Sequence, residues 1–357
     1  MSLQIKVTKT KHSRLSEMDF SNIPFGKIFT DHMFVVDFID GKWQNAEIKP
    51  LDYIPTHPGN LAWHYGQSIF EGMKATISKE GNPLLFRTDK HIERLNASAW
   101  RMCMPELPKE IFMEGLRKLV YMERGWIPKQ EGSALYIRPL MYATDESIGV
   151  RASDSYRFII MCLPVGPYYS QPVKLKAEEH FVRAVKGGVG EAKTSGNYAA
   201  SLRPSTMARA EGYDQMMWLD AVEFKYIQEV GTMNIFFVIG DEVITPATDG
   251  AILKGITRDC IITLLRDKGY KVVERQFSID EMVEAFDKGS LVEVFGAGTA
   301  AVIAPVCKIK YKDRIFEFDT TKYEVSKLSK ATIEGIRAEK IEDKFGWIEP
   351  VYEEVLA

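Results

Sequence analysis

Cysteine is scarce in this sequence, and the few cysteines stand far apart. The 357 residues include four, with no CxxC pair among them: Cys103, Cys162, Cys260 and Cys307. Disulfide-stapled proteins and cysteine-based metal or redox sites need dense or closely spaced cysteines. The spacing therefore excludes both classes and indicates no metal site. We expect the thiols to be buried in the core.

The sequence also lacks a long hydrophobic run and a strong charge of either sign. No apolar stretch approaches the roughly 20 residues that cross a membrane, and the first residues lack the apolar core of a signal peptide. The formal net charge is -3, with both signs spread along the chain, which excludes a basic surface for nucleic acid or an anionic membrane. We therefore expect a cytoplasmic protein whose partner is a small molecule or a second copy of itself.

Length and periodicity predict two globular domains of the α+β class. At 45% hydrophobic and 27% charged residues, the chain can bury more than one ordinary core. Strand-like and helix-like segments do not alternate regularly, as they would in a doubly wound sheet. Ser278 and Glu281 have the spacing of a capping box and predict the start of a short helix. A stretch rich in proline and tyrosine interrupts the pattern. We predict a smaller N-terminal domain over residues 1–167, a linker over 168–179 and a larger C-terminal domain over 180–357.

The segment GGVGEAKTSGNYAASL, residues 187–202, is similar to a phosphate-binding P-loop. Such a loop has the pattern GxxxxGK[ST], and Lys193 and Thr194 supply its last two positions. The match fails at Ala192, where the last glycine belongs, and Gly196 falls in the first turn of the helix that should follow. A P-loop nucleotide hydrolase, with Asp220 as the magnesium-binding aspartate, is therefore only a remote alternative.

A second interpretation makes Lys193 a covalent amine. A free lysine is almost fully protonated at neutral pH, so an amine used for Schiff-base chemistry needs desolvation or a positive potential nearby. The N-terminus of the helix predicted just after Lys193 provides such a potential. The small residues around the lysine would admit a flat cofactor, and Tyr198 is close enough in sequence to share the pocket.

Three further stretches would suit a phosphorylated pyridine ring. Glu229, flanked by apolar residues in a predicted strand, would keep a ring nitrogen protonated. Ile256 and Thr257 precede a strong helix pattern, where free backbone N–H groups suit a phosphate. The small residues of FGAGTAAVIAP offer amides to a phosphate or a carboxylate. Taken singly, the three also fit an edge carboxylate, an N-cap and a strand bulge.

Together these motifs resemble those of the branched-chain amino acid aminotransferases, which are pyridoxal-phosphate enzymes of fold type IV. The resemblance rests on GGVGEAKTSGNY, QEVGTMN, KGITRD and GAGTAA, and on HYGQSIFEGMKA and FRTDKHIERLNASAWRMCMP earlier in the chain. It covers nearly the whole sequence, in order. It implies the two-domain architecture of the D-amino acid aminotransferase-like fold. It also implies reversible, ping-pong transamination of L-leucine, L-isoleucine and L-valine with 2-oxoglutarate.

The resemblance further implies which residues bind pyridoxal 5'-phosphate. Lys193 matches the lysine that bonds to the cofactor and carries the proton between substrate and cofactor. Tyr198 matches the tyrosine at the cofactor's phenolic oxygen, and Glu229 matches the partner of its ring nitrogen. An arginine suits the phosphate because its fork can donate two bonds at once. The residues matching the phosphate site are Arg94, Ile256, Thr257 and Thr299.

For the substrates, the resemblance implies an apolar pocket with a polar edge. The pocket's aromatic residues are Phe25, Tyr65, Phe70, Tyr136 and Tyr168. Arg138 matches the polar edge that accepts the second carboxylate of 2-oxoglutarate. The side that receives the α-carboxylate consists of Thr232, Ala300 and Ala301. The loop DESIGVRA resembles a segment that closes the pocket of a neighbouring subunit with Ile148 and Val150, which implies a homodimer.

Two enzymes of the same fold are the nearest alternatives, a D-amino acid aminotransferase and an aminodeoxychorismate lyase. Both are typically shorter at the N-terminus, and the wording of FEGMKA and EVGTMN favours the branched-chain enzyme. A lyase would differ in its reaction, because it would not return the cofactor as pyridoxamine phosphate.

Overall fold

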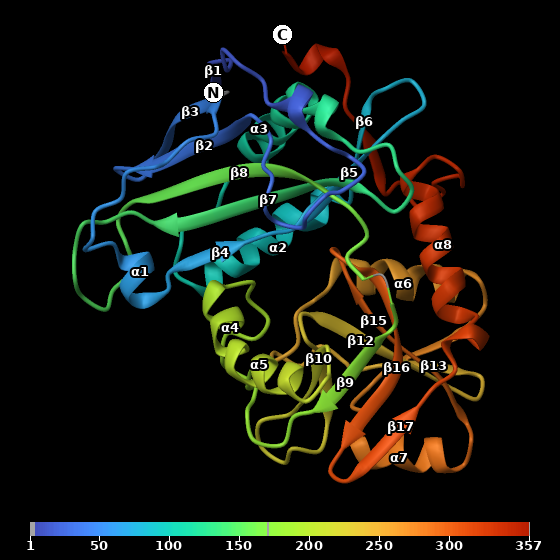
Figure 1. The fold of residues 1–357 in the computed structure, drawn as a ribbon. Coiled ribbons are helices and arrows are strands. Elements are labelled where there is room, and N and C mark those ends of the chain that lie inside the picture. Colours follow the sequence, from blue (N-terminus) through green and yellow to red (C-terminus); the bar gives the residue numbers. More distant parts are fainter. Residues whose placement is uncertain (1–3, 170, 357) are drawn as a thin grey trace. The chain divides into compact units, whose positions relative to one another are not determined.

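The described part of the chain consists of two compact units. The computed structural model describes residues 4–169 and 171–356 (Figure 1). One unit comprises residues 4–168, 192–195 and 334–356, and the other comprises residues 169, 171–191 and 196–333. The domain limits predicted from the sequence stay a prediction, and residue 170 of the predicted linker lies outside the described residues.

The first unit contains a largely antiparallel sheet. Its strands are β1 (Lys6–Val7), β2 (His32–Ile39), β3 (Lys42–Pro50), β4 (Ser68–Phe70), β5 (Met73–Ile77), β6 (Pro83–Phe86), β7 (Ala134–Ala143), β8 (Tyr156–Val165) and β18 (Ile348–Pro350). They lie in the order β1-β3-β2-β8-β7-β5-β6-β18, β4 also pairs with β7, and only the short β1–β3 pair is parallel. Asp40 and Gly41 join β2 to β3 with positive φ at both residues, as a type I′ turn requires.

Helices cover one face of this sheet (Figure 1). The helices of the unit are α1 (Leu61–Tyr65), α2 (Thr88–Arg101) and α3 (Lys109–Met122), with short 3-10 turns η1 (Leu15–Glu17), η2 (Arg124–Trp126) and η4 (Glu353–Leu356). Phe112 and Leu116 of α3 share a core with Phe34 and Phe158 of the strands. Because side chains alternate along a strand, Tyr136 and its even-numbered neighbours in β7 lie on the face opposite α2 and α3.

The second unit contains a mixed sheet. Its strands are β9 (Val173–Ala177), β10 (Gln215–Leu219), β11 (Ile227–Val230), β12 (Met233–Ile239), β13 (Glu242–Thr245), β14 (Lys271–Glu274), β15 (Leu291–Gly298), β16 (Val302–Tyr311) and β17 (Arg314–Glu317). Their order is β11-β10-β9-β16-β15-β12-β13-β14, with β17 beside β16 and an additional β11–β12 pair. The pairs β9–β10, β9–β16 and β13–β14 are parallel.

Helices α5 (Leu202–Ala210), α6 (Ile256–Asp267) and α7 (Ile279–Asp287) and the 3-10 turn η3 (Thr320–Lys322) belong to the second unit. Helices α4 (Ser195–Ala200) and α8 (Val325–Arg337) include residues of both units. Ser278 and Glu281 form the predicted capping box at the start of α7. The α+β class predicted from the sequence is confirmed.

The cysteines only partly follow the prediction of buried thiols. Cys162 and Cys260 are buried and Cys307 is half-buried, but Cys103 is exposed. Cys103 has a positive φ in the turn that follows α2, where the chain leaves the core. Within residues 4–169 and 171–356, no helix is both long and apolar enough to span a membrane.

The start of α8 depends on a buried carboxylate. Glu293 of β15 accepts hydrogen bonds from the N–H groups of Glu324, Val325 and Ser326 at 2.5, 2.8 and 2.9 Å. The first N–H groups of a helix have no partner within it, so an acceptor from elsewhere must supply one. Glu293 therefore ties α8 to the sheet of the second unit.

We predict that Glu293→Gln lowers the free energy of unfolding by about 1–3 kcal/mol, because a neutral amide replaces a buried charged acceptor and turns an NH2 group toward the helix. Denaturant titration followed by circular dichroism measures the change. Glu317→Gln, which alters an exposed carboxylate paired with Lys308, is the matched control and should leave the transition nearly unchanged. Equal effects of the two substitutions would contradict the prediction.

Candidate active site

Lys193 is held by its backbone in the first unit. Its carbonyl accepts a hydrogen bond from the Phe70 N–H at 3.0 Å, and its own N–H donates to the Ser98 hydroxyl at 2.9 Å. The next residue, Thr194, pairs with Ile69 of β4. The segment around Lys193 thus lies beside β4. The Lys193 Nζ is 4.9 Å from the centre of the Phe70 ring.

Five predicted substrate residues contact one another on the sheet face opposite α2 and α3, and one of them, Phe70, lies beside Lys193. The Phe25 ring meets the rings of Tyr168 and Tyr136 edge to face, with centres 4.9 and 5.9 Å apart. The Arg138 Cζ lies 4.7 Å from the centre of the Phe70 ring, and its Nη2 donates to the Tyr136 hydroxyl at 3.0 Å. These residues, Phe25, Phe70, Tyr136, Arg138 and Tyr168, are called the aromatic cluster below.

A glycine makes room for the cluster. A Cβ atom at Gly72 would lie 2.1 Å from the Tyr136 hydroxyl oxygen, much closer than real contacts allow. Tyr136 could keep its place only if residue 72 had no side chain. The glycine of the FEGMKA motif is therefore required by the packing of the aromatic cluster.

Three other predicted substrate residues lie elsewhere in the first unit. Tyr65 is the last residue of α1, and the centre of its ring lies 6.2 Å from that of the neighbouring His64. Ile148 and Val150 lie in the loop between β7 and β8 and are 63% and 89% exposed. Asp145 fixes this loop by accepting hydrogen bonds from backbone N–H groups of residues 154 and 155. The loop thus presents two apolar side chains to the outside.

A buried carboxylate directs Arg94, the predicted phosphate ligand on α2. The Arg94 Nε and Nη2 donate to the two oxygens of Glu71 at 2.7 and 2.8 Å, and the His91 Nδ1 lies 2.7 Å from one of them. Burial acts to raise the pKa of Glu71, but the charge and hydrogen bonds of Arg94, together with His91, hold it well below its ordinary value. Glu71 is therefore ionised and fixes the direction of the guanidinium.

In the second unit, Tyr198 and Glu229 line one hollow with Thr232, Arg183 and Leu253. Glu229 lies in β11 and is buried. Its Oε1 accepts a hydrogen bond from the Asn234 Nδ2 at 3.1 Å, and its Oε2 lies 2.5 Å from the Arg183 Nη2. A cation and an amide thus compensate the buried carboxylate while it borders the hollow beside a phenol.

The predicted phosphate residues of the second unit lie at two chain turns. Helix α6 begins at Ile256, and its N-cap Gly255 provides no side-chain acceptor for the first N–H groups, including that of Thr257. The other turn, Thr299 to Ala301, joins β15 to β16 and is half-buried. Free amides at a helix start attract an anion, so the start of α6 suits a phosphate, and the roles of both turns stay predictions.

One amide side chain links Glu229 to the start of α6. The Asn234 Nδ2 donates to Glu229 and also to the carbonyl of Leu253 at 3.0 Å. A Cβ atom at Gly255 would lie 1.9 Å from the Asn234 Oδ1, so only glycine fits there. Asn234 therefore fixes the predicted ring-nitrogen partner and the entry to the predicted phosphate turn together.

The structure gives the nucleotide hypothesis no support. Asp220, the aspartate considered for magnesium, accepts hydrogen bonds from the backbone N–H groups of residues 222, 223, 225 and 226 and so closes a turn. Among the described residues, no group of three or more His, Cys, Asp or Glu side chains could hold a metal ion.

Comparison with known proteins identifies the family. The model of the class IV aminotransferases matches residues 68–309. The chain belongs to this family. It is 45% identical to branched-chain-amino-acid aminotransferase 2 of Bacillus subtilis, over 97% of this chain and 96% of that protein. It is 47% identical to a probable branched-chain-amino-acid aminotransferase of Staphylococcus epidermidis, over 97% and 98%. The crystal structure of the Escherichia coli branched-chain amino acid aminotransferase, 28% identical, superposes with a TM-score of 0.74 over 90% of this chain and 99% of that one. The resemblance inferred from the motifs is confirmed.

Sequence reasoning missed four residues that support the predicted site of this class IV aminotransferase: Glu71, His91, Arg183 and Asn234. Glu71 and Asn234 lie inside motifs that were used to identify the family, FEGMKA and EVGTMN, but nothing local assigned them a partner. His91 precedes Arg94 by one helical turn, which was an available signal. Arg183 had none, because its contact with Glu229 arises only from the packing of the second unit.

We predict that Glu71→Gln lowers the free energy of unfolding by about 3–5 kcal/mol, because it removes the buried carboxylate charge that pairs with the guanidinium of Arg94. The pKa of Glu71 is lowered on folding, so its contribution is present above the unfolded pKa and is lost only as the pH falls through the folded value. The loss in unfolding free energy caused by Glu71→Gln should therefore be similar at about pH 8 and about pH 5.5 in denaturant titrations.

Glu93→Gln is the matched control for Glu71→Gln, because Glu93 lies on the same helix as Arg94 but is exposed and pairs with Lys90. It should leave the denaturation midpoint nearly unchanged. A deficit for Glu71→Gln that disappears between neutral pH and about pH 5.5 would contradict the lowered pKa.

Proposed function

We propose that this chain reversibly transfers the amino group of L-leucine, L-isoleucine or L-valine to 2-oxoglutarate, with pyridoxal phosphate as cofactor. Two relatives that match almost end to end are named branched-chain-amino-acid aminotransferases. The observation that carries the proposal is the group formed by Lys193, Phe70 and Arg138, an amine and a cation on one aromatic ring. Such a group would serve an apolar amino acid and a dicarboxylic acid in turn.

The residues of each unit fit the cofactor. A buried, compensated carboxylate, Glu229, borders a hollow together with Tyr198, which suits a ring nitrogen and a phenolic oxygen. The uncapped start of α6 and the directed guanidinium of Arg94 suit a phosphate dianion. When bound, pyridoxal phosphate supplies a ring that withdraws electrons from the α-carbon of the amino acid.

Lys193 would have two tasks. Its Nζ would bond to the cofactor, and once displaced by the amino group of the substrate it would hold and move the proton of the α-carbon. The hydrogen bonds of its main chain to Phe70 and Ser98 support this role, because they fix the Cα from which the side chain extends. Glu229 would hold a proton at the ring nitrogen.

The aromatic cluster would receive the side chain of the substrate. Its rings offer apolar area, and one methylene changes binding in such a pocket by only about 1–3 kcal/mol, so all three branched-chain amino acids should be accepted. The Arg138 Nε is buried and, among the described residues, donates to no acceptor. A donor of this kind would bind the second carboxylate of 2-oxoglutarate. On the α-carboxylate side, Thr232, Ala300 and Ala301 would supply the polar groups.

A homodimer and a cytoplasmic location also belong to the proposal. The exposed Ile148 and Val150 support the former, because two apolar side chains on a loop fixed by Asp145 suit burial against a second copy.

A spectroscopic experiment tests the proposal. Purified protein incubated with pyridoxal phosphate should develop a visible absorption band that L-leucine removes and 2-oxoglutarate restores. Lys193→Ala should lose this response, because no amine bonds to the cofactor. Lys186→Ala, which removes an exposed lysine of the same segment, should keep it.

Three results would contradict parts of the proposal. A band that is unchanged by L-leucine but is removed by D-alanine would indicate a D-amino acid aminotransferase. A band that neither amino acid removes would favour an aminodeoxychorismate lyase. The absence of any band after incubation would exclude the cofactor.

We predict that Arg138→Leu raises the KM for 2-oxoglutarate at least about tenfold, because it removes a charged donor to the second carboxylate. The KM for L-leucine should change much less. Steady-state kinetics with each substrate varied in turn measure both values, and an equal rise in the two would contradict the assignment.

A further inference from the structure

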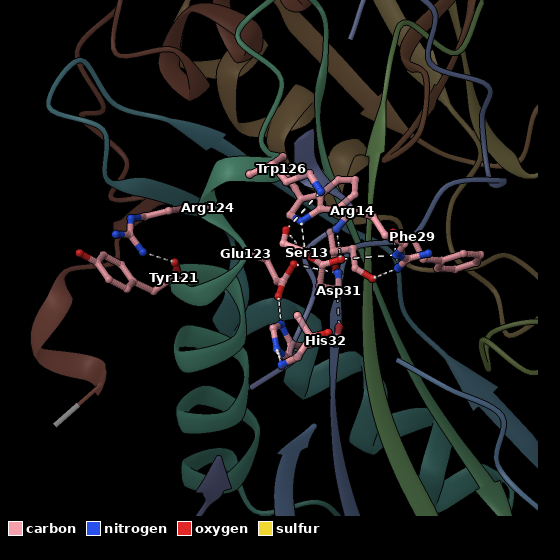
Figure 2. A network of polar contacts seen from close by, with 12 residues as sticks. Ser13, Arg14, Phe29, Asp31, His32, Tyr121, Glu123, Arg124 and Trp126 are labelled. Atoms are coloured by element: carbon pink, nitrogen blue, oxygen red, sulfur yellow. Dashed lines mark hydrogen bonds and ion pairs between the residues drawn. The ribbon is translucent and has the colours of Figure 1, made fainter. Parts of the chain in front are cut away.

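A buried polar network in the first unit is not used by the proposed chemistry (Figure 2). At its centre, Asp31 accepts hydrogen bonds from the Ser13 hydroxyl at 2.6 Å, the Arg14 N–H at 3.0 Å and the indole N–H of Trp126 at 3.2 Å. Burial acts to raise the pKa of Asp31, but these bonds and the charge of Arg14 lower it overall. Asp31 is therefore a charged acceptor in the protein interior.

The network holds together the two ends of a loop, residues 13–14 and residues 29–31, and these joined ends are called the neck below. The Arg14 Nη2 donates to the carbonyls of Phe29 and Thr30 at 3.2 and 2.8 Å, and its Nε lies 3.4 Å from the Asp31 Oδ1. Residues 13 and 14 are thereby bonded to residues 29–31, the two ends of one segment. Between these ends, from residue 15 to residue 29, no described residue is buried. Residues 15–29 are called the N-terminal loop below.

Hydrogen bonds to Glu123 also attach the neck to the end of α3. Glu123, which follows the last residue of that helix, accepts a hydrogen bond from the Asp31 N–H at 3.0 Å and contacts the His32 Nδ1. The His32 Nε2 accepts the Thr10 N–H at 2.8 Å, so the proton of the neutral ring is on Nδ1 and is donated to Glu123. Figure 2 shows Glu123, Asp31 and Trp126 converging on this point.

The tip of the N-terminal loop carries Phe25 to the aromatic cluster. The ring contacts Tyr168 and Tyr136 but remains 44% exposed, so these contacts alone do not bury it. Leu15, Met18 and Ile28 pack against the core only near the two ends of the loop, and no residue from 19 to 27 packs against that core, so the position of Phe25 depends on how the ends of the loop are held. The neck thus lies outside the aromatic cluster, at the ends of the loop that carries one member of the cluster.

From this geometry we propose that Arg14 and Asp31 are positioning residues that set the specificity of the enzyme. They hold the N-terminal loop closed so that Phe25 covers the apolar end of the amino-acid pocket. The inference rests on the proposed function, because it assigns the neck a role in binding the branched side chain. Neither residue touches the substrate.

Arg14→Ala tests the proposal, because half of the arginine side chain is exposed and its loss should spare the fold. We expect the KM for L-leucine to rise about tenfold while kcat changes less than about twofold, since a pocket wall is loosened but the reacting groups are not. Arg14→Lys keeps the charge and one donor, so it should fall between wild type and Arg14→Ala. Arg314→Ala, which removes a similarly exposed arginine paired with Asp287, is the control and should leave both constants unchanged.

A double-mutant cycle separates positioning from a merely structural effect. Phe25→Ala should raise the KM for L-leucine at least as much as Arg14→Ala does. If Arg14 acts through Phe25, adding Arg14→Ala to Phe25→Ala should raise it no further. Rises that multiply in the double variant, or an unchanged KM in Arg14→Ala, would overturn the proposal.

Proteolysis tests the neck without using activity. Lys27 is exposed in the N-terminal loop, so trypsin should cut there faster in Arg14→Ala than in wild type or Arg314→Ala. Equal rates of cleavage would overturn the closed neck. A wild-type protein that does not turn over L-leucine would instead refute the proposed function, and the cleavage rates would still decide on the neck.

Discussion

A carboxylate that is buried away from water needs hydrogen-bond donors or cations around it. In this chain, buried carboxylates fix the positions of several segments. Glu71 directs Arg94, Glu293 binds the start of α8, and Asp31 closes the neck of the N-terminal loop. Each of them contacts residues that are distant in sequence. Removing one partner of a buried charge pair such as Glu71 and Arg94 typically costs about 3–5 kcal/mol, whereas an exposed ion pair contributes only about 0–1 kcal/mol.

The same constraint organises the proposed cofactor residues of the second unit. Glu229 borders a hollow, and Arg183 and Asn234 compensate its charge. Because Asn234 also bonds to the carbonyl of Leu253, the carboxylate and the approach to α6 cannot shift independently. A ring nitrogen and a phosphate at opposite ends of one cofactor need such a fixed separation. Preorganised groups of this kind cost no rearrangement when the ligand binds.

Local patterns predicted local structure well and distant partners poorly. The capping box of Ser278 spans three residues, so its hydrogen bonds could be predicted from spacing alone, and the α+β class followed from periodicity. The family could be identified because its motifs are contiguous. The pairs of Glu71 with Arg94 and of Glu229 with Arg183 join separate elements, and no spacing rule indicates them. The prediction that Cys103 is buried was wrong for a local reason. Composition alone cannot show that the backbone turn after α2 directs this side chain outward.

The N-terminal loop shows how a segment without a core can still place a side chain. Its partly buried residues Leu15, Met18 and Ile28 pack against the core only near its two ends, and closing about 15 residues costs entropy that grows slowly with length. The contacts of Phe25 at the tip are two ring pairs, worth about 0.5–1.5 kcal/mol each. The neck has several hydrogen bonds to a buried charge, each worth about 1.5–3 kcal/mol. The neck is therefore the stronger end, and any opening of the loop should begin at Phe25.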